Sequence, residues 1–311
     1  MKVLVTGGSG FIGRYLVREL LGHGYEVRVM TRNPSAVIEG AEVSHGDITD
    51  VDTILPALEG IDAVFHNAAY ATDWGKKDEI YKANVEGTKN VAGACMTAGV
   101  DRMVFTSSAG IYGFPNSDRE ITEESPMKPL NTYHKSKLDA ETALEKFDGL
   151  GVSAVRPPLV LSAGAKAAEI ILSRIEQKNM TYIGSGSNKI SIAHPADVGR
   201  CLRLALEAKR DGAYNVVSFV CTIRELFEEI AASMGAEPPR KHVPYPVAYI
   251  AAFFSEMFSK SEPSLTRFRV KSLGTTRSIS CEKAVKELGY KPEFDMPATV
   301  EDMVSWYGNR K

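Results

Sequence analysis

The chain has 311 residues, of which 44% are hydrophobic and 24% charged, and its formal net charge is -2. This composition suits a folded chain of about two domains and argues against disorder. The small net charge gives no reason to expect a nucleic-acid partner. Four widely spaced cysteines offer neither metal-ligand spacing nor a disulfide framework, so we expect no metal site and a cytoplasmic location.

The first half of the chain alternates short apolar runs with helical patterns. Strands are predicted at Lys2–Thr6, Tyr25–Met30, Ala63–Asn67, Met103–Ser107 and Val152–Val155, and helices at Phe11–Leu21, Ile80–Ala98 and Tyr133–Phe147. Alternation of this kind is typical of an α/β fold in which helices cover both faces of a parallel sheet.

The second half is less regular. Helices are predicted at Ala196–Glu207, Thr222–Met234, Cys281–Leu288 and Val300–Tyr307, the second with a capping box of Thr222 and Glu225. The most apolar stretch, Val243–Phe258, carries two prolines and is too short to span a bilayer, so we expect no transmembrane segment. No linker separates the halves, which predicts a second domain packed against the first.

A glycine-rich turn joins the first strand to the first helix. Gly7 permits a tight turn, Gly10 lets the backbone approach a pyrophosphate, and Gly13 allows the helix to pack closely on the strand. The helix begins with Phe11 and Ile12, where free N–H groups attract an anion. The turn therefore predicts a dinucleotide site in a Rossmann doubly wound parallel sheet. A glycine turn without a ligand is the alternative.

The end of the second strand indicates which dinucleotide is bound. Sites for NAD usually place an acidic residue about 20 residues beyond the last glycine, to hold the ribose 2′-hydroxyl. Here Arg32 stands at that distance, and nothing acidic lies between Val27 and Pro34. A guanidinium suits a 2′-phosphate, which favours NADP(H) and leaves NAD(H) possible. The alternative is that Arg32 is a solvated surface residue.

Three polar residues form a candidate catalytic group. Tyr133 and Lys137 are four residues apart in a predicted helix and so share one face. An ammonium near a phenol lowers the phenol pKa from about 10, which would let Tyr133 exchange a proton with a substrate oxygen. Ser108 follows a strand end, where open parallel sheets bind ligands, and its hydroxyl could hydrogen-bond the same oxygen.

These motifs occur together in one known group of enzymes. The chain resembles the extended branch of the short-chain dehydrogenase/reductase superfamily, which includes the NAD-dependent epimerase/dehydratase family. The motifs of that branch are matched by Thr6–Gly13, Asp47, His66–Ala69, Asn84–Thr88, Ser108, Tyr133, Lys137 and Arg156–Pro158. The resemblance covers nearly the whole chain.

The resemblance implies a role for each matched residue. Tyr133 would be the acid/base, Lys137 would bind the nicotinamide ribose and tune Tyr133, and Ser108 would orient the substrate. The implied cofactor contacts are Asp47 at the adenine, together with Ile48, Asn67, Ala68, Ala69, Asn84, Thr106 and Pro157. For Asp47 and Asn84 the alternatives are a turn cap and a helix-surface amide. The resemblance also implies a homodimer.

Two sugar-nucleotide branches of the family match less well. Dehydratases usually carry acidic residues after the serine, but Ser108 is followed by Ala109 and a glycine. Epimerases usually have an asparagine shortly after the arginine of the turn at Arg156, and none occurs here. They also carry an arginine before a V-x-D segment, where this chain has only Lys189 as a cation.

The 3β-hydroxysteroid dehydrogenase-like and dihydroflavonol reductase-like branch matches best. It is resembled in Asp73–Gly75, Arg156–Pro158 and Pro244–Pro246, and its substrates are mostly apolar, ring-bearing alcohols or ketones. Candidate substrate contacts are Tyr70, Trp74, Ser108, Ala109 and His194, although a structural role suits His194 better. The segment Val247–Phe258 is interpreted as a substrate lid, as core of the second domain, or as a membrane contact.

These observations predict an NAD(P)-dependent oxidoreductase that transfers a hydride between nicotinamide and a secondary alcohol or ketone of a small-molecule substrate. The alternatives are an NAD-dependent sugar-nucleotide epimerase and a non-catalytic NADP(H)-sensing protein. We expect residues 1–156 plus about 189–220 to form the cofactor domain. Residues 157–188 plus 221–311 would form a smaller, interleaved substrate domain.

Overall fold

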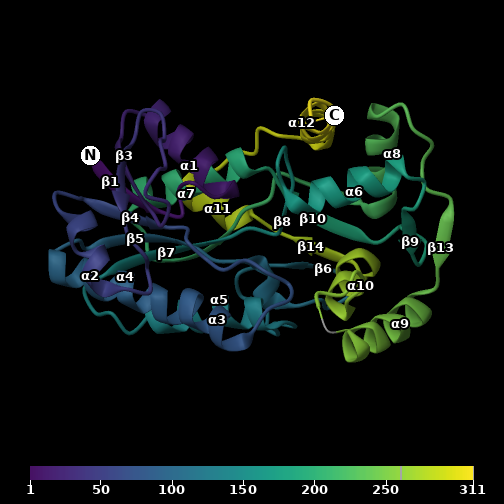
Figure 1. Cartoon of the computed structure of the whole chain (residues 1–311), viewed down its shortest axis with the longest axis horizontal. Coiled ribbons are helices and arrows are strands. Elements are labelled where there is room, and N and C mark those ends of the chain that lie inside the picture. Colours follow the sequence, from purple (N-terminus) through teal and green to yellow (C-terminus); the bar gives the residue numbers. More distant parts are fainter. Residues whose placement is uncertain (260, 311) are drawn as a thin grey trace.

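The large sheet forms one end of the molecule (Figure 1). The structure is a computed structural model that describes residues 1–259 and 261–310. Seven parallel strands run in the order β11-β7-β5-β4-β1-β2-β3. They are β1 (Lys2–Thr6), β2 (Glu26–Thr31), β3 (Glu42–His45), β4 (Ala63–His66), β5 (Arg102–Thr106), β7 (Gly151–Arg156) and β11 (Gly212–Asn215). All the strands predicted in the first half lie in this sheet, which confirms the doubly wound α/β fold.

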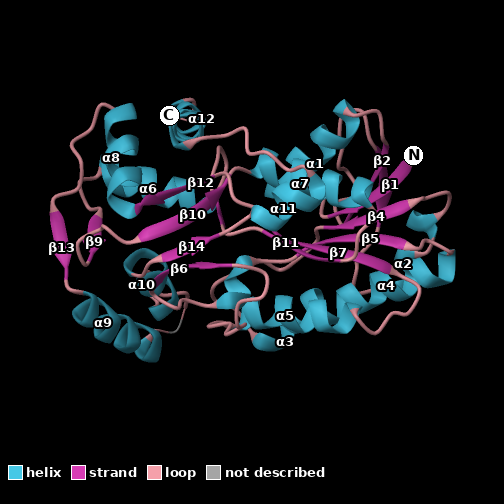
Figure 2. Ribbon diagram, turned by 180° about the vertical axis from the view of Figure 1, so that it is seen from behind, coloured by secondary structure: helices cyan, strands magenta, loops and turns pink. Residues whose placement is uncertain are grey.

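Helices cover both faces of the large sheet (Figure 2). One face carries α1 (Phe11–Gly22), α7 (Pro195–Ala208) and α11 (Glu282–Leu288). The other carries α2 (Val51–Ile54), the 3₁₀ turn η1 (Pro56–Leu58), α4 (Gly87–Ala98) and α5 (Thr132–Leu144).

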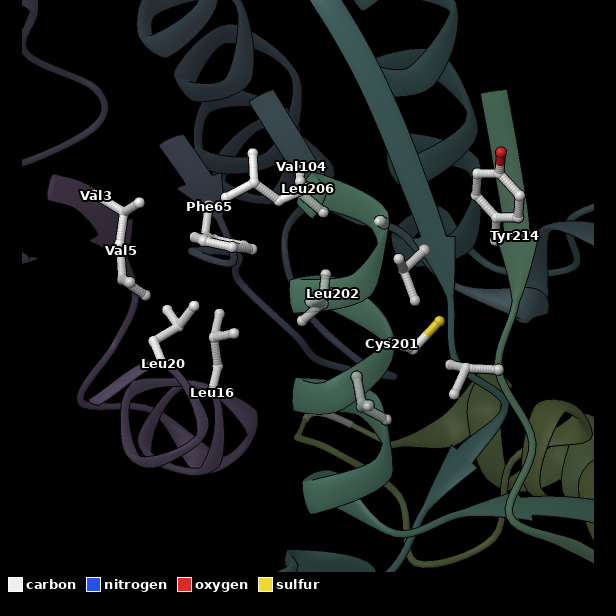
Figure 3. Close-up of a cluster of buried hydrophobic side chains, with 14 of the residues drawn as sticks. Val3, Val5, Leu16, Leu20, Phe65, Val104, Cys201, Leu202, Leu206 and Tyr214 are labelled. Atoms are coloured by element: carbon white, nitrogen blue, oxygen red, sulfur yellow. The ribbon is translucent and has the colours of Figure 1, made fainter. Parts of the chain in front are cut away.

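The sequence of β1 explains why two helical layers are needed. Val3 and Val5 pack with Leu16 of α1 and Leu202 of α7 (Figure 3), whereas Leu4 lies in the core on the opposite face. Successive side chains of a strand point to opposite faces, so an unbroken apolar strand must be covered on both sides.

The helix predicted at Ile80–Ala98 is not regular. It consists of α3 (Lys77–Tyr81), a π-helical turn η2 (Lys82–Glu86) and α4. Its end is as predicted, because Gly99 adopts the left-handed conformation, with φ of 74°, that closes many helices. π-Helical turns are frequent at functional sites, and this one carries the buried Asn84.

A second, smaller sheet lies beside the first. Its strands run in the order β12-β10-β14-β6, with β8 paired to β10. They are β6 (Ser117–Ile121), β8 (Leu159–Val160), β10 (Lys189–Ala193), β12 (Phe219–Thr222) and β14 (Arg277–Ile279). The helices α6 (Lys166–Glu176), α8 (Ile223–Ser233) and α12 (Met296–Gly308) enclose its core. The capping box predicted for Thr222 and Glu225 is confirmed at the start of α8.

The two units exchange segments. After β10, the chain returns to the large sheet through α7 and β11, whereas β6 leaves the first half of the chain for the second sheet. The smaller domain is therefore interleaved, as expected. By strand pairing, the return begins at Pro195 rather than near residue 189, because β10 pairs with β12, β14 and β8.

The apolar stretch in the second half forms a peripheral helix. A two-stranded ribbon of β9 (Thr181–Ile183) and β13 (Lys241–Val243) leads into α9 (Tyr245–Phe258), and α10 (Arg267–Gly274) follows. Only the small residues Ala248 and Ala252 of α9 are buried. Its large apolar side chains are exposed, by 57% at Ile250 and 75% at Phe258. The interpretation of this whole segment as core is therefore wrong. No helix in the described ranges is long and apolar enough to cross a bilayer.

Candidate active site

A cleft of about 1400 Å³ opens at the carboxyl ends of the parallel strands. Gly7 follows β1, Arg32 follows β2, Asn67 follows β4 and Ser107 follows β5, and all four line it. Ligands of open α/β sheets bind at this edge. The opposite wall comes from the second domain, so the cleft lies between the two units.

The glycine turn has the shape that the sequence predicts. Gly7 has φ of +68°, and a Cβ there would lie 2.7 Å from the Cα of Ala68. A Cβ at Gly13 would lie 2.1 Å from the carbonyl oxygen of Gly7, so side chains are excluded at both positions. Gly7 and Gly10 line the cleft with Phe11 and Ile12, whereas Gly13 lies behind the turn.

The start of α1 is open toward the cleft. Its N-cap, Gly10, makes no side-chain capping bond, and the first turn holds no acidic residue. Free N–H groups and the positive end of a helix dipole favour a phosphate at this place. The turn therefore fits the pyrophosphate of a dinucleotide.

Polar groups suited to an adenosine half lie at the ends of β2 and β3. Asp47 lines the cleft and accepts hydrogen bonds from the Thr49 backbone N–H at 2.8 Å and the Thr49 hydroxyl at 2.9 Å. Partial burial works against the charged carboxylate. The Thr49 hydrogen bonds and the nearby Arg32 and Lys82 nevertheless hold the pKa of Asp47 below its usual value. Arg32 is exposed at the rim, and Ile48 lines the cleft beside Asp47.

The turn after β4 holds the glycine loop in place. The Nδ2 of Asn67 donates to the carbonyl oxygen of Gly7 at 3.2 Å, and the N–H of Ala68 donates to the Thr6 hydroxyl at 3.2 Å. Asn67, Ala68 and Ala69 all line the cleft. This turn therefore supports the phosphate-binding loop and forms part of the cleft wall.

Asn84 does not line the cleft, although a cofactor contact was expected there. It is 1% exposed and its side-chain oxygen accepts from the Tyr70 N–H at 2.7 Å. Its Nδ2 donates to the hydroxyl of Ser136 at 2.9 Å. The π-helical turn directs this amide toward α5, so Asn84 connects the Tyr70 loop to the helix that carries Tyr133.

The three candidate catalytic residues do line one cleft. Tyr133 and Lys137 share a face of α5, which begins after the N-cap Asn131. Lys137 is 1% exposed, and its ammonium nitrogen lies 4.2 Å from the ring centroid of Phe105. Ser108 caps the short 3₁₀ turn η3 (Ala109–Tyr112), where its hydroxyl accepts from the Gly110 N–H at 3.1 Å.

The prediction that Lys137 lowers the pKa of Tyr133 is wrong for the protein without a ligand. Burial, and then the Asp73 carboxylate, raise the pKa of Tyr133 to about 12. Burial also lowers the pKa of Lys137 to about 7, against an opposing contribution from Glu141. A lowered phenol pKa requires a charged lysine nearby. In the folded chain, burial disfavours the charged forms of both groups.

Two hydroxyl groups beside the catalytic residues lack partners. Within residues 1–259 and 261–310, the buried Oγ1 of Thr106 and Oγ of Ser107 accept and donate no hydrogen bond. Both residues line the cleft, as does Pro157, whose carbonyl accepts from the Ala109 N–H at 2.9 Å. Buried polar groups in folded proteins nearly always have partners. These hydroxyls, with the glycine turn, therefore fit a polar ligand such as a dinucleotide.

The predicted substrate contacts divide into two sets. Tyr70 and Ser108 line the cleft, whereas Trp74, Ala109 and His194 do not. His194 caps α7, accepts from the Ala196 N–H at 3.2 Å and stacks on Phe294 with the ring centroids 3.6 Å apart. The structural interpretation of His194 is the one that this geometry supports. No residue of α9 lines the cleft, so the interpretation as a lid is wrong for that helix.

The cleft contains residues that the sequence argument missed. His134 lies next to Tyr133, with their ring centroids 5.2 Å apart, and also contacts Phe268 of α10 at 5.3 Å. Other lining residues that were not predicted as contacts include Ser107, Pro158, Leu159, Val160, Ser272 and Arg277, together with Asp73 and Lys82. The sequence signal for Asp73 was its position shortly after Ala68 and Ala69, in the matched segment Asp73–Gly75. Phe268 and Arg277 have no sequence signal, because only the folding of the second domain brings them near Tyr133.

No group of three or more His, Cys, Asp or Glu side chains within residues 1–259 and 261–310 is arranged to hold a metal ion. The four cysteines are free thiols, three of them buried.

The model of the NAD dependent epimerase/dehydratase family matches residues 3–217. The chain belongs to this family. It is thus an NAD-dependent enzyme of the extended short-chain dehydrogenase/reductase type, and the resemblance expected from its motifs is confirmed.

Two curated relatives match almost the whole chain. A 2-alkyl-3-oxoalkanoate reductase of Stenotrophomonas maltophilia is 32% identical, over 95% of this chain and 96% of its own. The decarboxylating sterol-4-alpha-carboxylate 3-dehydrogenase of Mus musculus is 30% identical, over 97% of this chain and 90% of its own.

Solved structures share the fold. The crystal structure of gox2253 has a TM-score of 0.85 and 29% identity, and the match covers 99% of this chain and 98% of that one. The structure of MoeE5 in complex with UDP-glucose and NAD has a TM-score of 0.81 and 23% identity, and the match covers 100% of this chain and 99% of that one.

Proposed function

We propose that this enzyme is an NADP(H)-dependent oxidoreductase that interconverts a secondary alcohol and a ketone on a mostly apolar substrate. The observation that carries the proposal is the meeting of Ser108, Tyr133 and Lys137 in the cleft beside an apolar wall. That wall includes Leu159, Val160 and Phe268 of the second domain. A bound nicotinamide dinucleotide would supply or accept the hydride.

The residues of the chain would manage the proton and the substrate oxygen. In the reducing direction, Tyr133 donates its phenolic proton to the carbonyl oxygen, while the Ser108 hydroxyl donates a hydrogen bond to the same atom. The raised pKa of Tyr133 keeps the phenol protonated, which suits a donor. Lys137 would hold a ribose hydroxyl, and the unpartnered hydroxyls of Thr106 and Ser107 suit other polar atoms of the dinucleotide.

The names of the two relatives narrow the proposed substrate class. One acts on a 3-oxoalkanoate, and the other dehydrogenates C3 of a sterol with a carboxylate on C4. In both names the reacting carbon is β to a carboxyl group. We include such β-oxygenated acids in the proposed class. A ring is not essential, because an alkanoate has none.

Three further parts of the proposal concern the choice of dinucleotide, the location and the assembly. Arg32, at the rim without an acidic neighbour in sequence, favours NADP(H) over NAD(H). Four free cysteines suit a reducing cytoplasm. A homodimer rests on the family resemblance alone.

The test is turnover with a panel of ketones, 3-oxo acids and UDP-sugars, followed by the loss of NADPH absorbance. Steady consumption of NADPH with a ketone or 3-oxo acid supports the proposal. Conversion of a UDP-sugar without net consumption of cofactor would instead identify an epimerase. Cofactor binding without turnover of any substrate would revive the sensing alternative.

A further inference from the structure

We propose that Arg277 forms a carboxylate-binding subsite in the substrate half of the cleft, where it would hold the acid group of a β-oxygenated acid. The inference rests on the proposed function and adds the residue that selects the acid. Arg277 begins β14 in the second sheet and lines the same cleft as Tyr133. It was not among the residues that the sequence indicated.

Arg277 is a half-buried cation without an anionic partner. Its guanidinium carbon lies 4.6 Å from the ring centroid of Phe114. Within residues 1–259 and 261–310 the guanidinium donates one hydrogen bond, to the Gly113 carbonyl, which is long at 3.5 Å. No carboxylate among the described residues pairs with it. Burial lowers its pKa to about 10, with no acidic group acting in the other direction. The side chain therefore remains charged at neutral pH.

Two other arginines, Arg156 and Arg269, are paired with carboxylates. Arg156 forms two hydrogen bonds to Glu141, at 3.1 and 2.5 Å. Arg269 pairs with Glu262 and lies 3.9 Å from Asp73. Taking a charge out of water is unfavourable unless an opposite charge and hydrogen bonds replace the lost hydration. Arg277 has no opposite charge beside it within the described residues and only the long hydrogen bond to Gly113, which is the state expected of a residue that binds an anionic ligand.

Arg277 lies on the catalytic side of the cleft rather than on the phosphate side. Burial, and then the charge of Arg277, lower the pKa of His134 to about 3, and His134 adjoins Tyr133. The ring of Phe268 contacts both His134 and Phe114, at centroid distances of 5.3 and 5.5 Å. An anion on Arg277 is thus a substrate group, because the cofactor phosphates have their place at the glycine turn.

The surroundings of Arg277 favour a carboxylate over a diphosphate. A single guanidinium offers two parallel N–H groups, which match the two oxygens of one carboxylate. The other lining residues of the second domain are Pro157, Pro158, Leu159, Val160, Phe268 and Ser272, none of which is a cation. A single guanidinium would leave part of the negative charge of a diphosphate without a partner. The alkyl part of a carboxylic acid, in contrast, would be buried against the apolar side chains of this wall.

The experiment compares an acid with its uncharged counterpart. The wild type, Arg277→Met and Arg277→Lys are assayed with NADPH, a freshly prepared 2-alkyl-3-oxoalkanoate and the methyl ester of that acid. Since hydrogen bonds to charged groups are strong, we expect Arg277→Met to lower kcat/KM for the acid by about 10- to 100-fold and to leave the ester nearly unchanged. Arg277→Lys restores part of the loss.

A matched control is Arg267→Met, because Arg267 of α10 pairs with Glu256 and does not line the cleft. It should turn over acid and ester as the wild type does. Equal losses for acid and ester in Arg277→Met, or no loss for either, would overturn the subsite.

Calorimetry separates this inference from the proposed function. The NADPH-loaded proteins are titrated with a saturated 2-alkylalkanoic acid and, separately, with UDP-glucose. Binding of the acid to the wild type and not to Arg277→Met supports the subsite even if no ketone or 3-oxo acid is reduced, a result that would contradict the proposed function alone. Absence of acid binding, or dependence on Arg277 for UDP-glucose only, would overturn the carboxylate assignment.

Discussion

The side-chain amide of Asn84 donates a hydrogen bond to the hydroxyl of Ser136, 2.9 Å away and one residue before Lys137. Ser136 in turn donates to the carbonyl oxygen of Tyr133 at 2.7 Å. The π-helical turn is therefore connected to the backbone between the two main candidate catalytic residues. Asn84 acts in this structure as a positioning residue for α5.

Replacing this amide should disturb both stability and turnover. In Asn84→Ala, the partly buried Tyr70 N–H and the buried Ser136 hydroxyl lose their hydrogen bonds to this amide, so we expect a loss of about 1–3 kcal/mol in the free energy of unfolding. Urea unfolding measures it, with the exposed Asn179→Ala as a control that should match the wild type. A positioning role also requires a lower kcat with KM for NADPH little changed. An unchanged kcat would reduce Asn84 to a structural role.

Tyr133→Phe removes the phenolic hydroxyl, which donates the proton to the substrate oxygen in the proposed mechanism. Since a positioned general acid contributes about 10²- to 10⁴-fold, we expect kcat to fall by that factor. The affinity for NADPH, measured by fluorescence titration, should stay close to that of the wild type because the ring remains in place. We expect Ser108→Ala to lower kcat by a smaller factor than Tyr133→Phe does. Full activity of Tyr133→Phe would contradict the mechanism.

Lys137→Met should stabilise the ligand-free protein while abolishing activity. The pKa of Lys137 is lowered by burial from 10.5 to about 7, so below about pH 7 the folded state carries the cost of a buried charge. Between about pH 7 and pH 10.5, Lys137 is uncharged in the folded state but still protonated in the unfolded state. The free energy of unfolding of the wild type therefore rises with pH over this range. The advantage of Lys137→Met, on the order of a few kcal/mol, should thus be largest below about pH 7 and shrink toward about pH 10. Urea unfolding across this range tests it, and a pH-independent difference would show that burial does not control the lysine.

Arg32→Ala tests the choice of dinucleotide. If the guanidinium binds a 2′-phosphate, the affinity for NADPH should fall by about 10- to 100-fold, while the affinity for NADH stays within a small factor. Arg14→Ala serves as a control, since Arg14 also belongs to the glycine-loop region but does not line the cleft. A wild type that prefers NADH would contradict the NADP(H) proposal at once.

The amino-acid sequence by itself determined the parts of the site that depend on local spacing. The glycine turn needs only a strand, three glycines and a helix start, and all of these lie between Lys2 and Gly22. Tyr133 and Lys137 share a face because they are one helical turn apart. The parallel sheet follows from strands that are apolar on both faces, since each must be covered by helices.

Only the tertiary structure decided what depends on burial and on distant segments. The direction of the Tyr133 pKa shift reverses because the fold buries the phenol near Asp73 and also buries the ammonium of Lys137. Asn84 turns from the cleft toward α5 because of a π-helical turn that no periodicity predicts. Arg277 reaches the catalytic side through β14, which pairs with β10 and β6 from other parts of the chain. Burial and strand pairing are properties of the whole chain, so local spacing does not reveal them.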